Sequence, residues 1–354
     1  MPPSDEFKEA VRVGDGQRIR TLCSLGKVDA AAATEALKSL KHPADVLRAL
    51  LEHGADANQV PLHVLRRCHD LETFKLLAEY GLDIKSKDHE ILEDLVGQRY
   101  ILDFLLDKGA DISKPSNRTS GRTKLRGGER DHTLGVLNNA AALGDAALFD
   151  HLVSRGADPS KSIALHHAAR CQDAAKTTAM IAHLVDRHHF DVNASDGCGG
   201  LRDFFGDVPD IGSPLNFAVV FKNLAAVEAL LERGADTEGK LAVAGGGASG
   251  AAADQDQEDG HRRYPVATAI GDGYTFRGFV EALRPLLEAG ADATVGLRCA
   301  VDRNNLDAAR LLLDFGGDPK LVKEMDAQRV EESGDPDGYA GMSREMSQLL
   351  EKRE

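Results

Sequence analysis

Histidine is the residue type in this chain with the widest choice of chemistry, and the sequence contains thirteen. Five of them lie close together, at His166, His167, His183, His188 and His189. Two zinc ligands on one α-helical face are usually four residues apart, as in the H-E-x-x-H pattern, which this sequence lacks. His183 and His188 are five residues apart, so their spacing disfavours a shared metal ion. We therefore expect no metal ion, no cofactor and no catalytic residue.

Cysteines and glycines also lack a reactive pattern. The five cysteines, Cys23, Cys68, Cys171, Cys198 and Cys299, contain no C-x-x-C pair and are odd in number, which indicates neither a zinc site nor a disulfide framework. The glycine-rich stretches at residues 197–200 and 245–247 are not followed by the Lys-Ser/Thr of a phosphate-binding loop. Reduced thiols are typical of the cytosol and the nucleus, where we expect the protein.

The charge of the chain restricts its partners. Asp and Glu outnumber Lys and Arg by 57 to 43, which gives a formal net charge of -14. This charge repels a phosphate backbone, so we expect no nucleic acid and favour a protein partner that is neutral or basic. No run of the sequence approaches the roughly 20 apolar residues of a membrane span, nor does the charged start resemble a secretory signal. We therefore expect a cytoplasmic or nuclear protein without membrane contact, and the sequence leaves its oligomeric state open.

One phrase recurs along the chain, an apolar stripe followed by Gly-Ala-Asp or a close variant. Its eight occurrences are LRALLEHGAD ending at Asp56, FKLLAEYGLD at Asp83, LDFLLDKGAD at Asp111, LFDHLVSRGAD at Asp158, IAHLVDRHHFD at Asp191, VEALLERGAD at Asp236, LRPLLEAGAD at Asp292 and ARLLLDFGGD at Asp318. Apolar residues at i, i+3, i+4 and i+7 predict a helix with one buried face. Glycine is typical of the left-handed residue that ends a helix. We call these eight aspartates the Asp markers.

A second, shorter apolar segment precedes several stripes. It reads VPLH from Val60, ALHHAA from Ala164 and SPLNFA from Ser213. These segments resemble the T-P-L-H-x-A opening of ankyrin repeats, whose period is about 33 residues. The resemblance implies an all-α ankyrin-repeat solenoid of about eight to nine helix-pair repeats, because one pair cannot bury its stripe without neighbours. It also implies that His63 and His166 are structural hydrogen-bonding groups.

The distances between successive Asp markers vary far more than the stripes do. In chain order they are 27, 28, 47, 33, 45, 56 and 26 residues. The short intervals predict that one stripe passes almost directly into the next helix. The long ones predict three finger-loop insertions, at residues 114–132, 195–212 and 239–264, that project from one edge of the solenoid. We place the repeat array at residues 1–320 and a C-terminal linker and capping helix at residues 321–354.

The resemblance also implies which side chains contact a partner. In ankyrin repeats these belong to the finger loops and to two variable positions after the paired small residues of the inner helix. The candidate contact residues are Arg67, Arg170, Val220, Phe221 and Arg303 from inner helices, and Phe204, Phe205, Arg262, Arg263 and Tyr264 from the insertions. Arginine and aromatic residues are enriched among the side chains that contribute most to binding.

Three functions are compatible with this pattern. We favour an adaptor that binds a partner protein along the concave finger-loop face. The alternative is an unusual enzyme that holds a small molecule in the concave groove, with Asp196, Arg202, Asp207, His261 and Tyr264 as acid–base groups. A closed, deep pocket would favour the enzyme, and an open groove the adaptor. The third hypothesis is a plain scaffold without a dedicated site.

Overall fold

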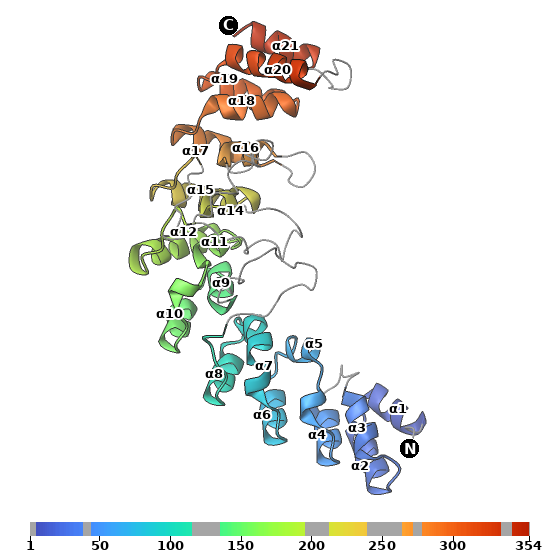
Figure 1. The fold of residues 1–354 in the computed structure, drawn as a ribbon. Helices are drawn as coiled ribbons and strands as arrows, with labels where there is room; N and C mark the ends of the chain where they lie inside the picture. The colour runs from blue at the N-terminus through green and yellow to red at the C-terminus, as the bar shows by residue number, and fades with distance from the viewer. Residues whose placement is uncertain are drawn as a thin grey trace. The chain divides into compact units, whose positions relative to one another are not determined.

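The computed structural model describes residues 5–37, 44–114, 135–194, 212–238, 264–271, 278–333 and 342–353 (Figure 1). Helices make up the regular structure of these ranges, which contain no strand. The all-α class predicted from the sequence is therefore confirmed. Every helix in the same ranges is too short or too polar to span a lipid bilayer.

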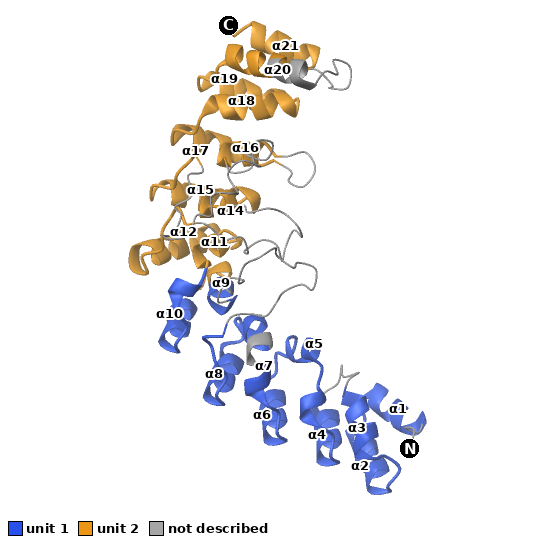
Figure 2. Ribbon diagram, viewed as in Figure 1, with its two compact units in different colours: residues 1–119, 132–140, 147–162 blue, residues 120–131, 141–146, 163–354 orange. Residues whose placement is uncertain are grey.

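The chain divides into two compact units (Figure 2). Unit 1 comprises residues 1–119, 132–140 and 147–162, and unit 2 comprises residues 120–131, 141–146 and 163–354. The helices up to the division are α1 (Asp5–Val13), α2 (Gly16–Ser24), α3 (Ala30–Leu37), α4 (Ala44–Glu52), η1 (Ala57–Gln59), α5 (Leu62–Leu65), α6 (Leu71–Glu79), α7 (Ile84–Ile91), η2 (Leu92–Leu95), α8 (Arg99–Asp107), α9 (Gly135–Ala142), α10 (Ala146–Ser154) and η3 (Pro159–Lys161). Those that follow in unit 2 are α11 (Ala164–Ala168), α12 (Ala174–Ala182), η4 (His183–Arg187), α14 (Pro214–Val220), α15 (Leu224–Leu231), α16 (Pro265–Ile270), η6 (Val280–Ala282), α17 (Leu283–Glu288), α18 (Ala293–Asp302), α19 (Leu306–Asp314), α20 (Pro319–Ser333) and α21 (Arg344–Glu351).

Helices stack in chain order within each unit. In unit 1, α2, α4, α6 and α8 pack successively on one another. In unit 2, α11, α14, α16, α18 and α20 form one row, here called the inner row, and α12, α15, α17, α19 and α21 form the outer row (Figure 1). Pairs such as α14 with α15 and α18 with α19 also pack together, and their apolar faces carry fully buried residues such as Phe217, Leu230, Leu297 and Leu312.

The recurrent glycine ends a helix in a left-handed turn. The backbone φ angle lies between 82° and 105° at Gly54, Gly81, Gly109, Gly156, Gly234, Gly290 and Gly316. After each of these glycines, the next N–H donates to the carbonyl five residues back, as from Ala235 to Leu230 at 3.0 Å. This bond satisfies a carbonyl that the end of the helix would leave unpaired, and glycine adopts the turn without a clash at Cβ. The predicted helix stops are confirmed at these seven positions.

The Asp markers cap the segment that follows them. Each of the eight side chains accepts a hydrogen bond from a backbone N–H two or three residues later, as Asp292 does from Thr294 at 2.7 Å. Short polar side chains favour this local geometry, which explains why aspartate recurs. After Asp56, Asp83 and Asp292 the next helix begins at the following residue. The direct passage predicted from the short intervals is therefore confirmed.

A second hydrogen bond joins neighbouring repeats, and its acceptor lies two residues after an Asp marker. The acceptors are Asn58 Oδ1, Asn193 Oδ1, Glu238 Oε1 and Thr294 Oγ1, and the donors are the backbone N–H groups of Asp83, Asp236, Asp292 and Asp318, at 2.7, 2.8, 3.1 and 3.1 Å. The successive Asp markers joined in this way lie between 26 and 56 residues apart along the chain. The same junction therefore forms whether the connection is short or long.

Some predictions fall on residues that the structure does not describe. The interiors of the predicted insertions at residues 114–132, 195–212 and 239–264 lie outside the described ranges, so their common edge stays a prediction. At the C-terminal end, α20 continues through residue 320, where we place the boundary of the repeat array. The last helix, α21, is capped by the side chain of Ser343.

Candidate functional site

Six of the ten candidate contact residues are described, and five of these belong to unit 2. Arg170, Val220, Phe221 and Arg303 lie at or just after the ends of three inner-row helices, α11, α14 and α18, and we call these four residues the inner-helix ends. Tyr264 precedes α16 and so lies at the start of an inner-row helix. Arg67 is exposed after α5 in unit 1. The other four candidates, Phe204, Phe205, Arg262 and Arg263, lie outside the described residues.

The end of α11 is built around two buried histidines. His166 Nε2 lies 3.1 Å from the carbonyl oxygens of both Ala194 and Gly212, so this nitrogen carries the proton. Arg170 donates from Nη1 to His167 Nδ1 at 2.8 Å, which requires that nitrogen to be unprotonated. Burial lowers the pKa of His166 to about 4. Burial, followed by the charge of Arg170, lowers the pKa of His167 to about 3. Both imidazoles are therefore neutral near pH 7.

His166 connects the two described ends of a predicted insertion. Ala194 precedes residues 195–211 and Gly212 follows them, so one imidazole fixes where this part of the chain leaves the stacked helices and where it returns. The structural role that the resemblance implies is confirmed for His166. It is wrong for His63, which is exposed. Because Asp83 leads directly into α7, no comparable loop is available to His63.

A cluster of aromatic side chains links α11 to α14. Phe217 is fully buried and packs edge-on against His166, with ring centroids 4.9 Å apart. Phe221 follows at the C-terminal cap of α14, with its ring 6.2 Å from that of Phe217. Phe221 and Val220 are both half-buried. An aromatic side chain held against a buried neighbour is rigid and offers apolar contact area at low entropic cost.

The two arginines of the inner-helix ends differ in their exposure and in their hydrogen-bond partners. Arg303 is exposed, and its Nε donates to the carbonyl of Gly271 at 3.1 Å, which holds the side chain against the end of α16. Arg170 is half-buried and donates to His167. Arg303 is therefore the better placed of the two for contact with another molecule.

Asn223 is a structural residue that sequence reasoning missed. Its Oδ1 caps α15 by accepting from the N–H of Ala226 at 3.1 Å. Its Nδ2 donates to the carbonyl oxygens of Ala169 and Cys171, at 3.0 and 2.7 Å, just after α11 in the preceding helix pair. The available signal was an asparagine directly before an outer stripe, which predicts the cap but not the bonds to the preceding repeat.

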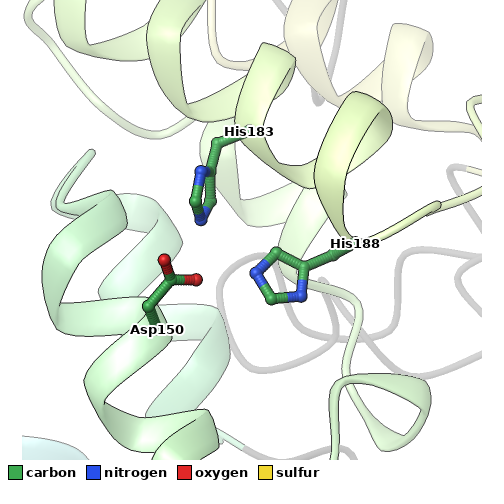
Figure 3. A group of neighbouring side chains, drawn as sticks. All are labelled: Asp150, His183 and His188. Atoms are coloured by element: carbon green, nitrogen blue, oxygen red, sulfur yellow. The ribbon is translucent and has the colours of Figure 1, made fainter.

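His183 and His188 lie side by side in unit 2, contrary to what their spacing predicts. Residues His183–Arg187 form a π-helix, and the N–H of His188 donates to the carbonyl of His183 at 3.3 Å. Residues five apart share a face in such a turn. The two ring centroids are 5.0 Å apart in an edge-on arrangement (Figure 3). Our expectation assumed a regular α-helix and is wrong on this point. Asp150, also labelled in Figure 3, belongs to α10 of unit 1.

The residues of the enzyme hypothesis are largely undescribed. Asp196, Arg202, Asp207 and His261 lie outside the described ranges. Tyr264 is half-buried, and its backbone carbonyl accepts from the N–H of Thr268 at 3.0 Å. The acid–base site therefore stays a prediction.

No protein-family model matches the chain, and a search of curated proteins finds no match. Function is therefore inferred from the residues and their geometry.

Proposed function

We propose that this chain is an ankyrin-repeat protein. Three observations support the proposal: the two rows of stacked helices in unit 2, the left-handed glycine that ends each of seven stripes, and the buried His166 at the histidine position of the family motif. An ankyrin repeat is one helix pair that buries its apolar face only against its neighbours. On this proposal, the long intervals between Asp markers are finger-loop insertions.

We further propose that the chain binds a protein partner through the inner-helix ends of unit 2. The observation that carries this proposal is the position of Phe221 and Arg303. Each lies two residues before the asparagine that caps the next outer helix, Asn223 or Asn305, so the two occupy equivalent places in two helix pairs. Phe221 is half-buried and Arg303 is exposed, and both residue types are enriched at protein interfaces.

The scaffold and the charge of the chain favour this use. A stacked array is already ordered before a partner arrives, so binding immobilises few additional groups. The formal net charge of -14 favours a partner that is neutral or basic. The arginine and the phenylalanine then supply the local contacts that select one partner among many of that charge.

A matched pair of double variants tests the surface. Phe221→Ala with Arg303→Ala removes the proposed contacts. Glu228→Ala with Arg310→Ala is the control, because these exposed residues lie on the outer helices α15 and α19 of the same two pairs. Circular dichroism and the unfolding midpoint establish that both variants fold.

Affinity capture from a cell extract then compares the variants with the wild type. We expect a partner that the wild type and the control recover and that the Phe221/Arg303 variant loses. Truncation of a dominant contact costs about 2 kcal/mol, or roughly 30-fold in Kd. Recovery of the same partner with an unchanged Kd by the folded Phe221/Arg303 variant would refute the proposed surface.

A further inference from the structure

The outer helix that follows α11 is longer than the next one in unit 2. The left-handed residue His189 lies 16 positions after the cap of this helix, Asp173, whereas Gly234 lies 11 positions after Asn223. The five extra residues are not a whole number of α-helical turns, because one turn takes about 3.6 residues. The chain accommodates them with the π-helical turn at His183–Arg187.

The hydrogen bonds at the end of this helix show the same widening. Phe190 donates to the carbonyl of Leu184, six residues back, at 3.1 Å, whereas the corresponding bond spans five residues after each of the seven glycines. His189 has a φ angle of 57°, in the left-handed region that disfavours a residue with Cβ. The outer helices α15 and α19 stack without a π turn, so stacking alone does not require one. Such turns often occur at functional sites.

The π turn brings two metal-ligand atoms together. A ring nitrogen of His183 and a ring nitrogen of His188 lie within 4.8 Å of each other (Figure 3). Zinc binds imidazole nitrogen at 2.0–2.1 Å, so two nitrogens on one tetrahedral ion are roughly 3.3 Å apart. Rotation about the side-chain torsions of the two residues covers the difference. Both side chains are half-buried, so each keeps part of its surface open to solvent.

We propose that His183 and His188 form a binding site for a divalent transition-metal ion, with Zn²⁺ as its representative. Imidazole is a preferred ligand of Zn²⁺, Cu²⁺ and Ni²⁺. Two protein ligands leave the other positions of a tetrahedral ion to water or to an external group, unlike a structural zinc site, in which the protein fills all four. The bound ion therefore exchanges with solution and is removed by a chelator. The site does not depend on the proposed partner surface.

Three glutamine variants test the site. His183→Gln and His188→Gln each remove one proposed ligand and keep a polar side chain. His189→Gln is the matched control, because it removes an adjacent, exposed histidine outside the pair. Chelator-treated full-length protein is titrated with Zn²⁺ by calorimetry. We expect the wild type and His189→Gln to bind one more equivalent in the tightest class than His183→Gln and His188→Gln do.

A second measurement separates loss of a ligand from loss of structure. In wild-type protein, the imidazole NMR signals of His183 and His188 should shift as the first equivalent of Zn²⁺ is added, and circular dichroism should be the same for all four proteins. Equal stoichiometry and affinity in the four proteins would overturn the proposal. A loss in the His189 variant as large as that in the other two would do the same, because it would show that the turn as a whole, and not the pair, determines binding.

Discussion

Gly234 and His189 occupy the same left-handed position at the ends of two outer helices of unit 2, with φ angles of 82° and 57°. We predict opposite effects of substitution: Gly234→Ala destabilises its helix end and His189→Gly stabilises its own. A Cβ at Gly234 would meet no heavy atom of the described residues within 4 Å, so the backbone conformation is the main cost. That cost is roughly 1–2 kcal/mol, offset by about 0.4–1 kcal/mol from the smaller entropy of the unfolded chain.

The net change in the free energy of local unfolding is about 0.5–1 kcal/mol. It is a decrease in Gly234→Ala and an increase in His189→Gly, and hydrogen exchange measures it locally. Stacked repeats open in parts, so mass spectrometry of individual peptides is preferable to one global midpoint. A change of 1 kcal/mol alters an opening equilibrium about fivefold. We expect amides of α15 to exchange about two- to fivefold faster in Gly234→Ala, and amides of α12 to exchange more slowly by a similar factor in His189→Gly.

Glu228→Ala is the control for the first variant, because it places alanine in α15 itself at an exposed helical position. Exchange in this control should stay close to that of the wild type. Unchanged exchange of α15 in Gly234→Ala would refute the idea that the left-handed turn limits the stability of these helix ends. Faster exchange of α12 in His189→Gly would show that contacts of the imidazole outweigh its unfavourable backbone conformation.

The remaining predictions concern acid stability, packing and thiol reactivity. Burial lowers the pKa of His166 to about 4 and that of His167 to about 3, from an ordinary 6.5, so the unfolded chain binds more protons as the pH falls. The stability associated with the neutral imidazoles is complete above pH 6.5 and is lost as the pH falls through about 4 for His166 and about 3 for His167, and urea midpoints measured across this range should decrease accordingly. Gly296→Ala should cost about 1–3 kcal/mol, read as a lower thermal midpoint, because its Cβ would lie 2.6 Å from Leu312 Cδ2. Burial raises the pKa of Cys299 to about 11, so iodoacetamide at pH 8 should label this thiol about a hundredfold more slowly in the native protein than in urea, as judged by peptide mass spectrometry.

The sequence by itself determined the helix ends and their caps. The left-handed glycine at the end of a stripe lets the next N–H donate to the carbonyl five residues back, as from Ala235 to Leu230, and the Asp marker accepts from an N–H two or three residues later. Bonds of this range depend on residue type and local conformation, so a repeated phrase was enough to predict them. The apolar spacing also predicted the buried face of each outer helix, because residues three and four positions apart share one face of a helix.

Only the tertiary structure decided the roles of the histidines. His166 bonds to residues 28 and 46 positions away along the chain, and no local pattern gives that pairing. His183 and His188 meet because an outer helix with five extra residues packs on α15 and takes up a π turn before its end. Spacing along a regular helix placed the two imidazoles on different faces. Their actual separation depends both on the π turn and on how this helix packs against α15. The packing is a property of the folded chain.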